Sequence, residues 1–139
     1  MDKQQLLEFL KTKPHMVLSS INTNGLPQSA VVGFGVTNDL KLVFGTSAES
    51  RKAKNIAGNK NVSVVIGWDN QGTVQYEGTA RQLKGEEVNN YTEIYYSKNE
   101  SARAYKDDPN ERYFLIEPAW IRYTDVSKNP WAISEFKFS

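Results

Sequence analysis

The chain has no cysteine and only one histidine among its 139 residues. Without cysteine, disulfide bridges, thiolate metal sites and cysteine nucleophiles are excluded. A single histidine, His15, excludes most histidine-based metal sites and any serine–histidine triad built on a second histidine. We therefore expect no metal site, and we favour a structural role for His15 over a role as general acid or base.

Excess charge and long apolar segments are also lacking. The 17 basic and 16 acidic residues leave a formal net charge of +1, so the composition carries no electrostatic footprint for nucleic acid or for an anionic membrane surface. We find neither a signal peptide nor an apolar run of membrane-spanning length. The sequence therefore predicts a cytoplasmic protein whose partners include neither nucleic acid nor a membrane.

The composition that remains is that of one ordinary globular domain. Apolar residues make up 39% of the chain and charged residues 24%, which is typical of folded proteins and argues against disorder. A chain of this length can bury a hydrophobic core without covalent staples. We find no internal repeat, linker or low-complexity segment, so residues 1–139 are expected to form a single domain.

Short apolar stretches separated by turn residues occupy most of the chain. We expect strands at residues 15–23, 28–36, 40–45, 61–68, 73–83, 113–123 and 131–138, and helices at 2–13, 51–58 and 86–106. The run 61–68 is almost continuously apolar, which predicts a strand buried on both faces, and residues 69–72 form a tight turn. Six or seven strands with few helices predict a mostly β fold, an antiparallel β-barrel with α decoration.

The strand expected at residues 28–36 carries two glycines, Gly33 and Gly35, on one face. Glycine weakens a strand unless something must approach the backbone closely. Two interpretations remain open at this point. A flat ring could lie on that face, or the strand could be bulged or tightly curved within a barrel.

Hydroxyl and cationic side chains gather where the third expected strand passes into a short helix. Thr46 ends the strand, Ser47 or Ser50 can cap the helix, and Arg51 and Lys52 follow in its first turn. A helix N-terminus offers free N–H groups and a partial positive charge, so this segment predicts a phosphate site. The alternative is an ordinary solvated basic face, since short motifs carry a high false-positive rate.

Several segments together resemble the pyridoxamine 5'-phosphate oxidase-like family of FMN-binding split barrels, and in particular its general stress protein 26-like branch. The resemblance rests on residues 25–27, 28–35, 44–46, 50–52 and 77–81, and it covers about residues 14–138. It implies a homodimer with FMN at the interface, each site being built from both chains. The cofactor-binding residues that it implies are Ala30, Val31, Val32, Gly33, Gly45, Thr46, Ser50, Arg51, Lys52 and Thr73.

The chain departs from the oxidase pattern at several of these positions. Ala30 and Gly35 stand where the oxidases carry an arginine and a lysine, and Thr73 stands where they carry a flavin-contacting glutamine. Tyr91 matches a tyrosine that holds the substrate phosphate, but Tyr95 replaces the accompanying arginine. We therefore do not expect efficient oxidation of pyridoxamine 5'-phosphate.

The activity that the resemblance implies is FMN-dependent oxidation or reduction of a small molecule, in which the flavin accepts a hydride at N5. Lys52, Arg122 and backbone N–H groups of the second strand are candidate donors to the charge that develops on the ring, and no catalytic residue is identified. Two alternatives stay open: a non-catalytic flavin-binding or redox-sensing stress protein, and a deazaflavin-dependent reductase. Haem is disfavoured because a lone histidine is a poor basis for axial ligation.

Overall fold

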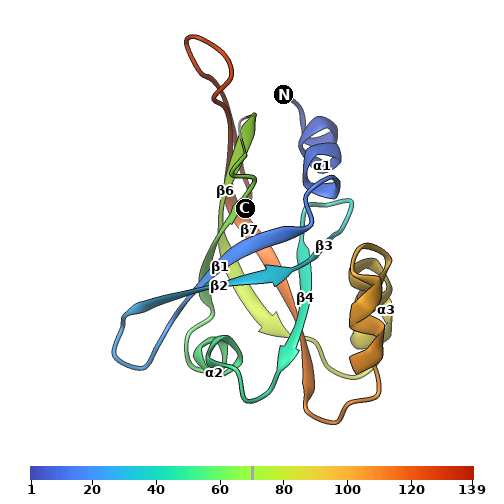
Figure 1. Ribbon diagram of the computed structural model, residues 1–139. Helices are drawn as coiled ribbons and strands as arrows, with labels where there is room; N and C mark the ends of the chain where they lie inside the picture. Colours follow the sequence, from blue (N-terminus) through green and yellow to red (C-terminus); the bar gives the residue numbers. More distant parts are fainter. Residues whose placement is uncertain (70) are drawn as a thin grey trace.

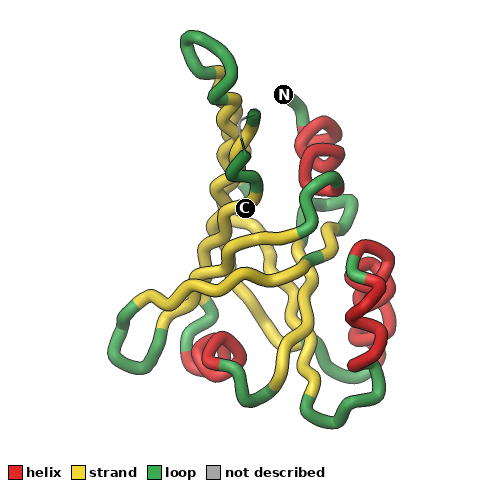
Figure 2. The backbone as a smooth tube through the Cα atoms, viewed as in Figure 1, coloured by secondary structure: helices red, strands yellow, loops and turns green. Residues whose placement is uncertain are grey.

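The computed structural model describes residues 1–69 and 71–139, and within them the chain forms a curled antiparallel sheet with helices on its outside (Figure 1, Figure 2). The strands occur in the order β2-β1-β5-β6-β7-β4-β3, and β8 pairs with the second half of β7. Their bounds are β1 His15–Ile21, β2 Pro27–Gly33, β3 Gly35–Val36, β4 Leu42–Ser47, β5 Asn61–Ile66, β6 Gly72–Gln82, β7 Glu111–Asp125 and β8 Ala132–Lys137. The mostly β, antiparallel fold class predicted from the sequence is confirmed.

Three α-helices and one 3₁₀ helix accompany this sheet in the part of the chain that the structure describes: α1 Lys3–Lys11, α2 Arg51–Gly58, α3 Glu86–Lys98 and η1 Glu100–Tyr105. Helix α1 begins with a capping box, in which Asp2 and Gln5 satisfy each other's backbone N–H groups. Helix α2 lies across one end of the sheet, and α3 lies alongside β4 (Figure 1).

One predicted strand and one predicted helix are each divided in two, and the side chain of Asn99 links the two points of division. The strand expected at 28–36 separates into β2 and β3 at Phe34, and the helix expected at 86–106 separates into α3 and η1 at Asn99. The amide Nδ2 of Asn99 donates to the carbonyl of Phe34 and to that of Tyr95, each at 2.9 Å. A long-range contact therefore replaces regular backbone pairing, which a local pattern cannot indicate.

Positions 33 and 35 require glycine because Asn99 and helix α3 of the same chain pack closely against them. A Cβ on Gly35 would lie 2.7 Å from the carbonyl oxygen of Ile94 in α3, and a Cβ on Gly33 would lie 2.3 Å from Oδ1 of Asn99. Both distances are too short for real Cβ contacts. Helix α3 and Asn99 therefore already account for glycine at both positions, so a flat ring is not required to explain them.

The strands around the core differ from the sequence pattern in one important way. β5 is buried on one face only, with Val62, Val64 and Ile66 inward and Val65 partly exposed, so the prediction of two buried faces is wrong. β7 continues through Pro118 because the sheet register shifts opposite Gly78, and a bulge accommodates a residue without an N–H. The turn expected at 69–72 includes Asn70, which lies outside the described residues.

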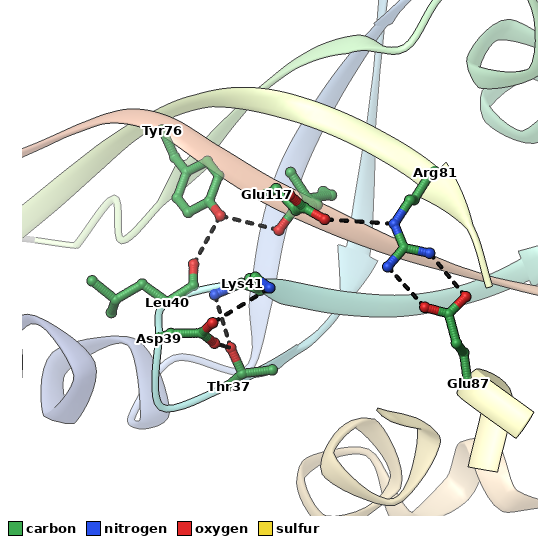
Figure 3. A network of polar contacts seen from close by, with 9 residues as sticks. Thr37, Asp39, Leu40, Lys41, Tyr76, Arg81, Glu87 and Glu117 are labelled. Atoms are coloured by element: carbon green, nitrogen blue, oxygen red, sulfur yellow. Dashed lines mark hydrogen bonds and ion pairs between the residues drawn. The ribbon is translucent and has the colours of Figure 1, made fainter. Parts of the chain in front are cut away.

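The buried phenol of Tyr76 links three segments of the chain in the core. Tyr76 is fully buried, and its hydroxyl donates to the carbonyl of Leu40 at 2.8 Å and to that of Ile116 at 3.2 Å (Figure 3). Burial, with the nearby Asp39 and Glu117 charges, holds the pKa of Tyr76 well above its usual range, so the phenol stays a donor. β6 is thereby tied to β7 and to the turn before β4.

The change Tyr76→Phe is expected to destabilise the fold by about 1–3 kcal/mol, because it leaves the buried carbonyl of Leu40 without a donor. Urea unfolding at neutral pH measures the difference. Tyr105→Phe is the matched control, since Tyr105 is 55% exposed, and we expect a change within about 0.5 kcal/mol. Equal stability of the two variants would contradict the role given to the Tyr76 hydroxyl.

Candidate functional site

Hydroxyl groups cap the start of α2, where the chain enters the helix from β4. Ser50 is the N-cap residue, in extended backbone conformation, and its Oγ accepts the backbone N–H of Ala53 at 3.2 Å. Thr46, near the end of β4, donates its hydroxyl to the same Oγ at 3.1 Å. Ser47, the other capping candidate, accepts from the backbone of Glu49 instead. Thr46 and Ser50 are thus held together at the helix mouth, as the sequence pattern predicted.

Arg51 and Lys52 occupy the first turn of α2 without a balancing anion. That turn contains no acidic residue, and neither side chain forms an ion pair or a hydrogen bond within residues 1–69 and 71–139. Lys52 is half-buried, and burial lowers the pKa of its ammonium group. Lys54, two residues after Lys52, is exposed, and its Nζ lies 3.8 Å from Oε2 of Glu49. The capped end of α2 therefore carries a partly desolvated positive charge that favours an added anion.

A side-chain network fixes α2 against the first two strands. The amide Nδ2 of Asn55 donates to Oγ of Ser20 in β1 at 3.0 Å and to Oε1 of Gln28 in β2 at 2.9 Å. Ala53 and Ile56 bury the opposite side of the helix against the core. Because Gln28 precedes Ala30 by two residues, the cationic turn of α2 is held near the strand that the sequence analysis assigned to the cofactor.

The outer face of the sheet presents a row of three valines, of which two are exposed and one is partly exposed. Val31 of β2, Val17 of β1 and Val65 of β5 are cross-strand partners and therefore share one face. The row continues to Gln75 of β6 and then to Arg122 of β7. Val31 is 64% exposed, which is unusual for a valine inside a strand. Such a continuous apolar face marks a surface that another molecule covers.

Arg122, named from the sequence as a candidate donor to the cofactor, already has a partner. Its guanidinium pairs with the carboxylate of Glu135 in β8 and lies 5.2 Å from the ring centroid of Trp120. Its positive charge is therefore largely compensated by this chain, in contrast to the charges of Arg51 and Lys52.

The predicted cofactor residues fall into three places. Thr46, Ser50, Arg51 and Lys52 gather at the mouth of α2, while Gly33, Gly45 and again Thr46 line a cavity of about 500 Å³. Ala30, Val31 and Val32 lie along β2 between these two groups, with Val32 buried and Val31 on the outer face. One chain thus places eight of these nine residues in adjoining parts of the surface, while Val32 lies in the core beneath them.

Thr73 is the exception. It lies in β6 opposite Thr124, six residues from Thr79, which pairs with Asn61 at the end of the sheet that α2 covers. At about 3.3 Å per residue this is a separation of about 20 Å along the strand. A single chain therefore does not bring Thr73 to the other predicted residues.

The cavity also contains residues that the sequence analysis did not assign to a site. Its lining includes His15, Tyr95, Asn99 and Glu111 in addition to the predicted glycines and Thr46. The side-chain pattern did not indicate this group, because α3 and η1 bring Tyr95 and Asn99 over β2 and β4 from far along the chain. Two signals were available: His15, the single histidine, whose cross-strand partner is Gly33, and Tyr95, which the resemblance placed at a substrate-phosphate position.

Within residues 1–69 and 71–139, no three histidine, cysteine, aspartate or glutamate side chains gather closely enough to hold a metal ion. None of the helices in that part of the chain has the length and hydropathy needed to span a membrane.

Comparison with known proteins places this geometry in context. The profile of the family described as "Pyridoxamine 5'-phosphate oxidase" matches residues 2–125. The chain is 33% identical over 132 residues to General stress protein 26 of Bacillus subtilis, covering 91% of this chain and 90% of that protein.

Two solved structures illustrate the fold. A pyridoxamine 5'-phosphate oxidase-related, FMN binding protein from Nostoc punctiforme gives a TM-score of 0.69 at 14% identity, covering 99% of this chain and 93% of that one. A heme binding protein from Mycobacterium smegmatis gives a TM-score of 0.82 at 16% identity, covering 99% of this chain but only 58% of that one. At these identities the likeness establishes a shared fold.

Proposed function

This chain belongs to the pyridoxamine 5'-phosphate oxidase family, and from that premise we propose that it is an FMN-binding flavoprotein that acts as an oxidoreductase on a small molecule. The observation that carries the proposal is the pair Arg51 and Lys52 at the capped start of α2, uncompensated within the described residues. A phosphate monoester supplies the dianion that this arrangement favours. Fold likeness to an FMN binding protein supports the same cofactor.

The residues present fit the two ends of FMN. Arg51, Lys52 and the hydroxyls of Thr46 and Ser50 would hold the phosphate, and β2 from Ala30 to Gly33, with Gly45, would face the ring. When bound, FMN supplies reversible hydride acceptance at its ring. The chain's own part is to hold the phosphate, orient the ring against β2 and limit the access of water to the cavity beside it.

We also propose a homodimer formed through the outer face of the sheet. The exposed row Val31, Val17 and Val65 is suited to a self-complementary apolar interface. A second copy would also resolve the position of Thr73, because the partner chain can bring its own Thr73 to a site that one chain leaves incomplete.

Val31→Lys tests the dimer. A lysine ammonium buried at an apolar interface without a partner is expected to raise the dimer dissociation constant more than about 100-fold. Analytical ultracentrifugation over a range of concentrations measures the dimer fraction. Leu26→Lys, in the β1–β2 turn, changes a comparably exposed apolar side chain outside this row and is expected to leave the dimer intact. A monomeric native protein, or a dimer insensitive to Val31→Lys, would contradict the proposed interface.

The test of the cofactor is direct. The purified protein is expected to show a flavin absorption spectrum, or to acquire one with added FMN, and FMN at 100 times its dissociation constant is expected to stabilise the fold by about 2.7 kcal/mol. Deazaflavin and haem are the competing ligands. Preferential uptake of either one, or no spectrum and no thermal shift with FMN, would overturn the proposal.

A binding or redox-sensing role without turnover is the second candidate. It is favoured by the absence of a lysine or arginine among the residues that line the cavity of about 500 Å³, where an anionic substrate group would need one. Anaerobic mixing of the FMN-loaded protein with reduced nicotinamide dinucleotides and with pyridoxamine 5'-phosphate discriminates the two. Bleaching of the flavin by any of these donors rejects the purely binding role. The cytoplasmic location stays a prediction.

A further inference from the structure

The cavity that Gly33, Gly45 and Thr46 share with α3 and η1 ends at an unpaired carboxylate. Glu111 begins β7, and its Oε2 lies 3.1 Å from the position that a Cβ would take on Gly45, so the carboxylate covers that glycine. Within residues 1–69 and 71–139, no hydrogen bond or ion pair involves this carboxylate. The carboxylate is partly buried, but its oxygens stay accessible to solvent, since no buried side-chain oxygen of the described residues lacks a partner. A ligand cation can therefore reach the carboxylate and pair with it.

The electrostatic surroundings of Glu111 are negative. Burial, and secondarily the charge of Asp108, raise the pKa of the Glu111 carboxyl group. The neighbouring guanidinium of Arg112 forms no ion pair with the carboxylate among the described residues, and its Nη1 donates to the backbone carbonyls of Pro109 and Glu111. The positive charge of Arg112 therefore does not neutralise the carboxylate of Glu111 at the end of the cavity.

Other nearby cations are also committed elsewhere. The ammonium of Lys98 donates to the carbonyl of Phe34 at 3.0 Å and lies 3.3 Å from the centroid of that ring. Burial lowers the pKa of Lys98 to about 8, while both contacts with Phe34 favour the charged form. Arg103 in η1 is held between Glu93 and Glu100. Neither side chain is placed to bind an anion in the cavity.

We propose that this cavity is the substrate pocket beside the proposed FMN site and that Glu111 selects substrates carrying an organic ammonium group, while phosphorylated and carboxylated molecules are rejected. The inference rests on the proposed function in treating the bound molecule as a substrate. The charge selectivity is a property of the cavity itself. Glu111 is a specificity-determining residue in this account, because its carboxylate would accept hydrogen bonds from the ammonium group.

Binding of small probes tests the selectivity. Benzylamine, benzyl alcohol and benzoate share one ring and differ in the charge of the attached group, and calorimetry on the FMN-loaded protein at pH 8 gives their dissociation constants. Benzylamine is expected to bind about 10- to 100-fold more tightly than benzyl alcohol, the range of one charge-assisted hydrogen bond, and benzoate most weakly. Pyridoxamine is likewise expected to bind more tightly than its 5'-phosphate.

Glu111→Gln is expected to reduce the benzylamine preference to within about threefold, because an amide keeps the size of the side chain and removes the charge. The same change at Glu8, exposed on α1, is the matched control and is expected to have no effect. Equal binding of the amine and the alcohol by the native protein, or an unchanged preference in Glu111→Gln, would overturn the inference.

The two proposals fail separately. Flavin absorbance reports FMN uptake before any probe is added. If FMN does not bind, the proposed function fails, and the same calorimetry on the cofactor-free chain still reads the selectivity of the cavity. If FMN binds and the amine preference is absent, only the inference about Glu111 fails. Thermal unfolding of Glu111→Gln, expected to match the native midpoint, separates lost selectivity from lost structure.

Discussion

Replacing Arg51 and Lys52 together by alanine is expected to weaken FMN binding by about 100- to 10,000-fold, because each charge-assisted hydrogen bond to a phosphate contributes about 1.5–3 kcal/mol. The expectation follows from the position of both cations at the capped start of α2, with no balancing carboxylate in its first turn. Lys52 should contribute the larger share, since it is half-buried and a bound anion would offset its desolvation.

Riboflavin makes this measurement specific for the phosphate. The native protein is expected to bind FMN far more tightly than riboflavin, which has the same ring and no phosphate, and the double variant should bind the two almost equally. Fluorescence titration of the flavin gives all four dissociation constants. Lys54→Ala, on the same helix but exposed and paired with Glu49, is the matched control and should change FMN affinity less than about twofold. A double variant that still discriminated FMN from riboflavin would place the phosphate elsewhere.

The largest effect on stability is expected from Gly35→Ala, at about 3 kcal/mol, because the added methyl group overpacks a rigid contact. The atoms that a Cβ would meet are the carbonyl of Ile94 and Cα of Tyr95, at 2.7 and 2.8 Å, and backbone atoms in the middle of α3 do not move easily. Relief of the overlap requires α3 to shift away from β3. Denaturant unfolding and the near-ultraviolet circular dichroism of the α3 tyrosines measure the two consequences.

Gly58→Ala is the matched control for the same chemical change. Gly58 is the last residue of α2, and a Cβ there meets nothing within 4 Å. Alanine in a helix is favoured over glycine by up to about 1 kcal/mol, so this variant is expected to be at least as stable as the native chain. Similar losses in both variants would show that the contact between Gly35 and α3 is not what requires glycine.

Local chemistry was readable in advance where one segment decides its own structure. The first helix, the helix cap at Ser50 and the strand expected at 73–83 all follow from neighbouring residues, and the structure has α1, α2 and β6 in these places. The hydroxyl and cationic residues of the α2 mouth belong to the same class, because they are consecutive in the chain.

Prediction was wrong where a distant segment intervened. The division of a strand at Phe34 and of a helix at Asn99 depends on one hydrogen bond between residues 65 positions apart. The apolar run 61–68 was expected to be buried on both faces, yet Val65 lies on the exposed outer face of β5. The sequence of a strand reports its hydrophobicity and not which face is covered.

The sequence by itself determined the class of fold, the strand spacing and a cationic helix start, since each depends on residues within a few positions of one another. Only the tertiary structure decided that Gly33 accommodates Asn99 and Gly35 accommodates α3, and that Thr73 lies far from the residues at the mouth of α2. It also decided that Glu111 faces a cavity without a partner among the described residues. These features arise where segments far apart in the chain meet, and such meetings are set by packing of the whole sheet and its helices.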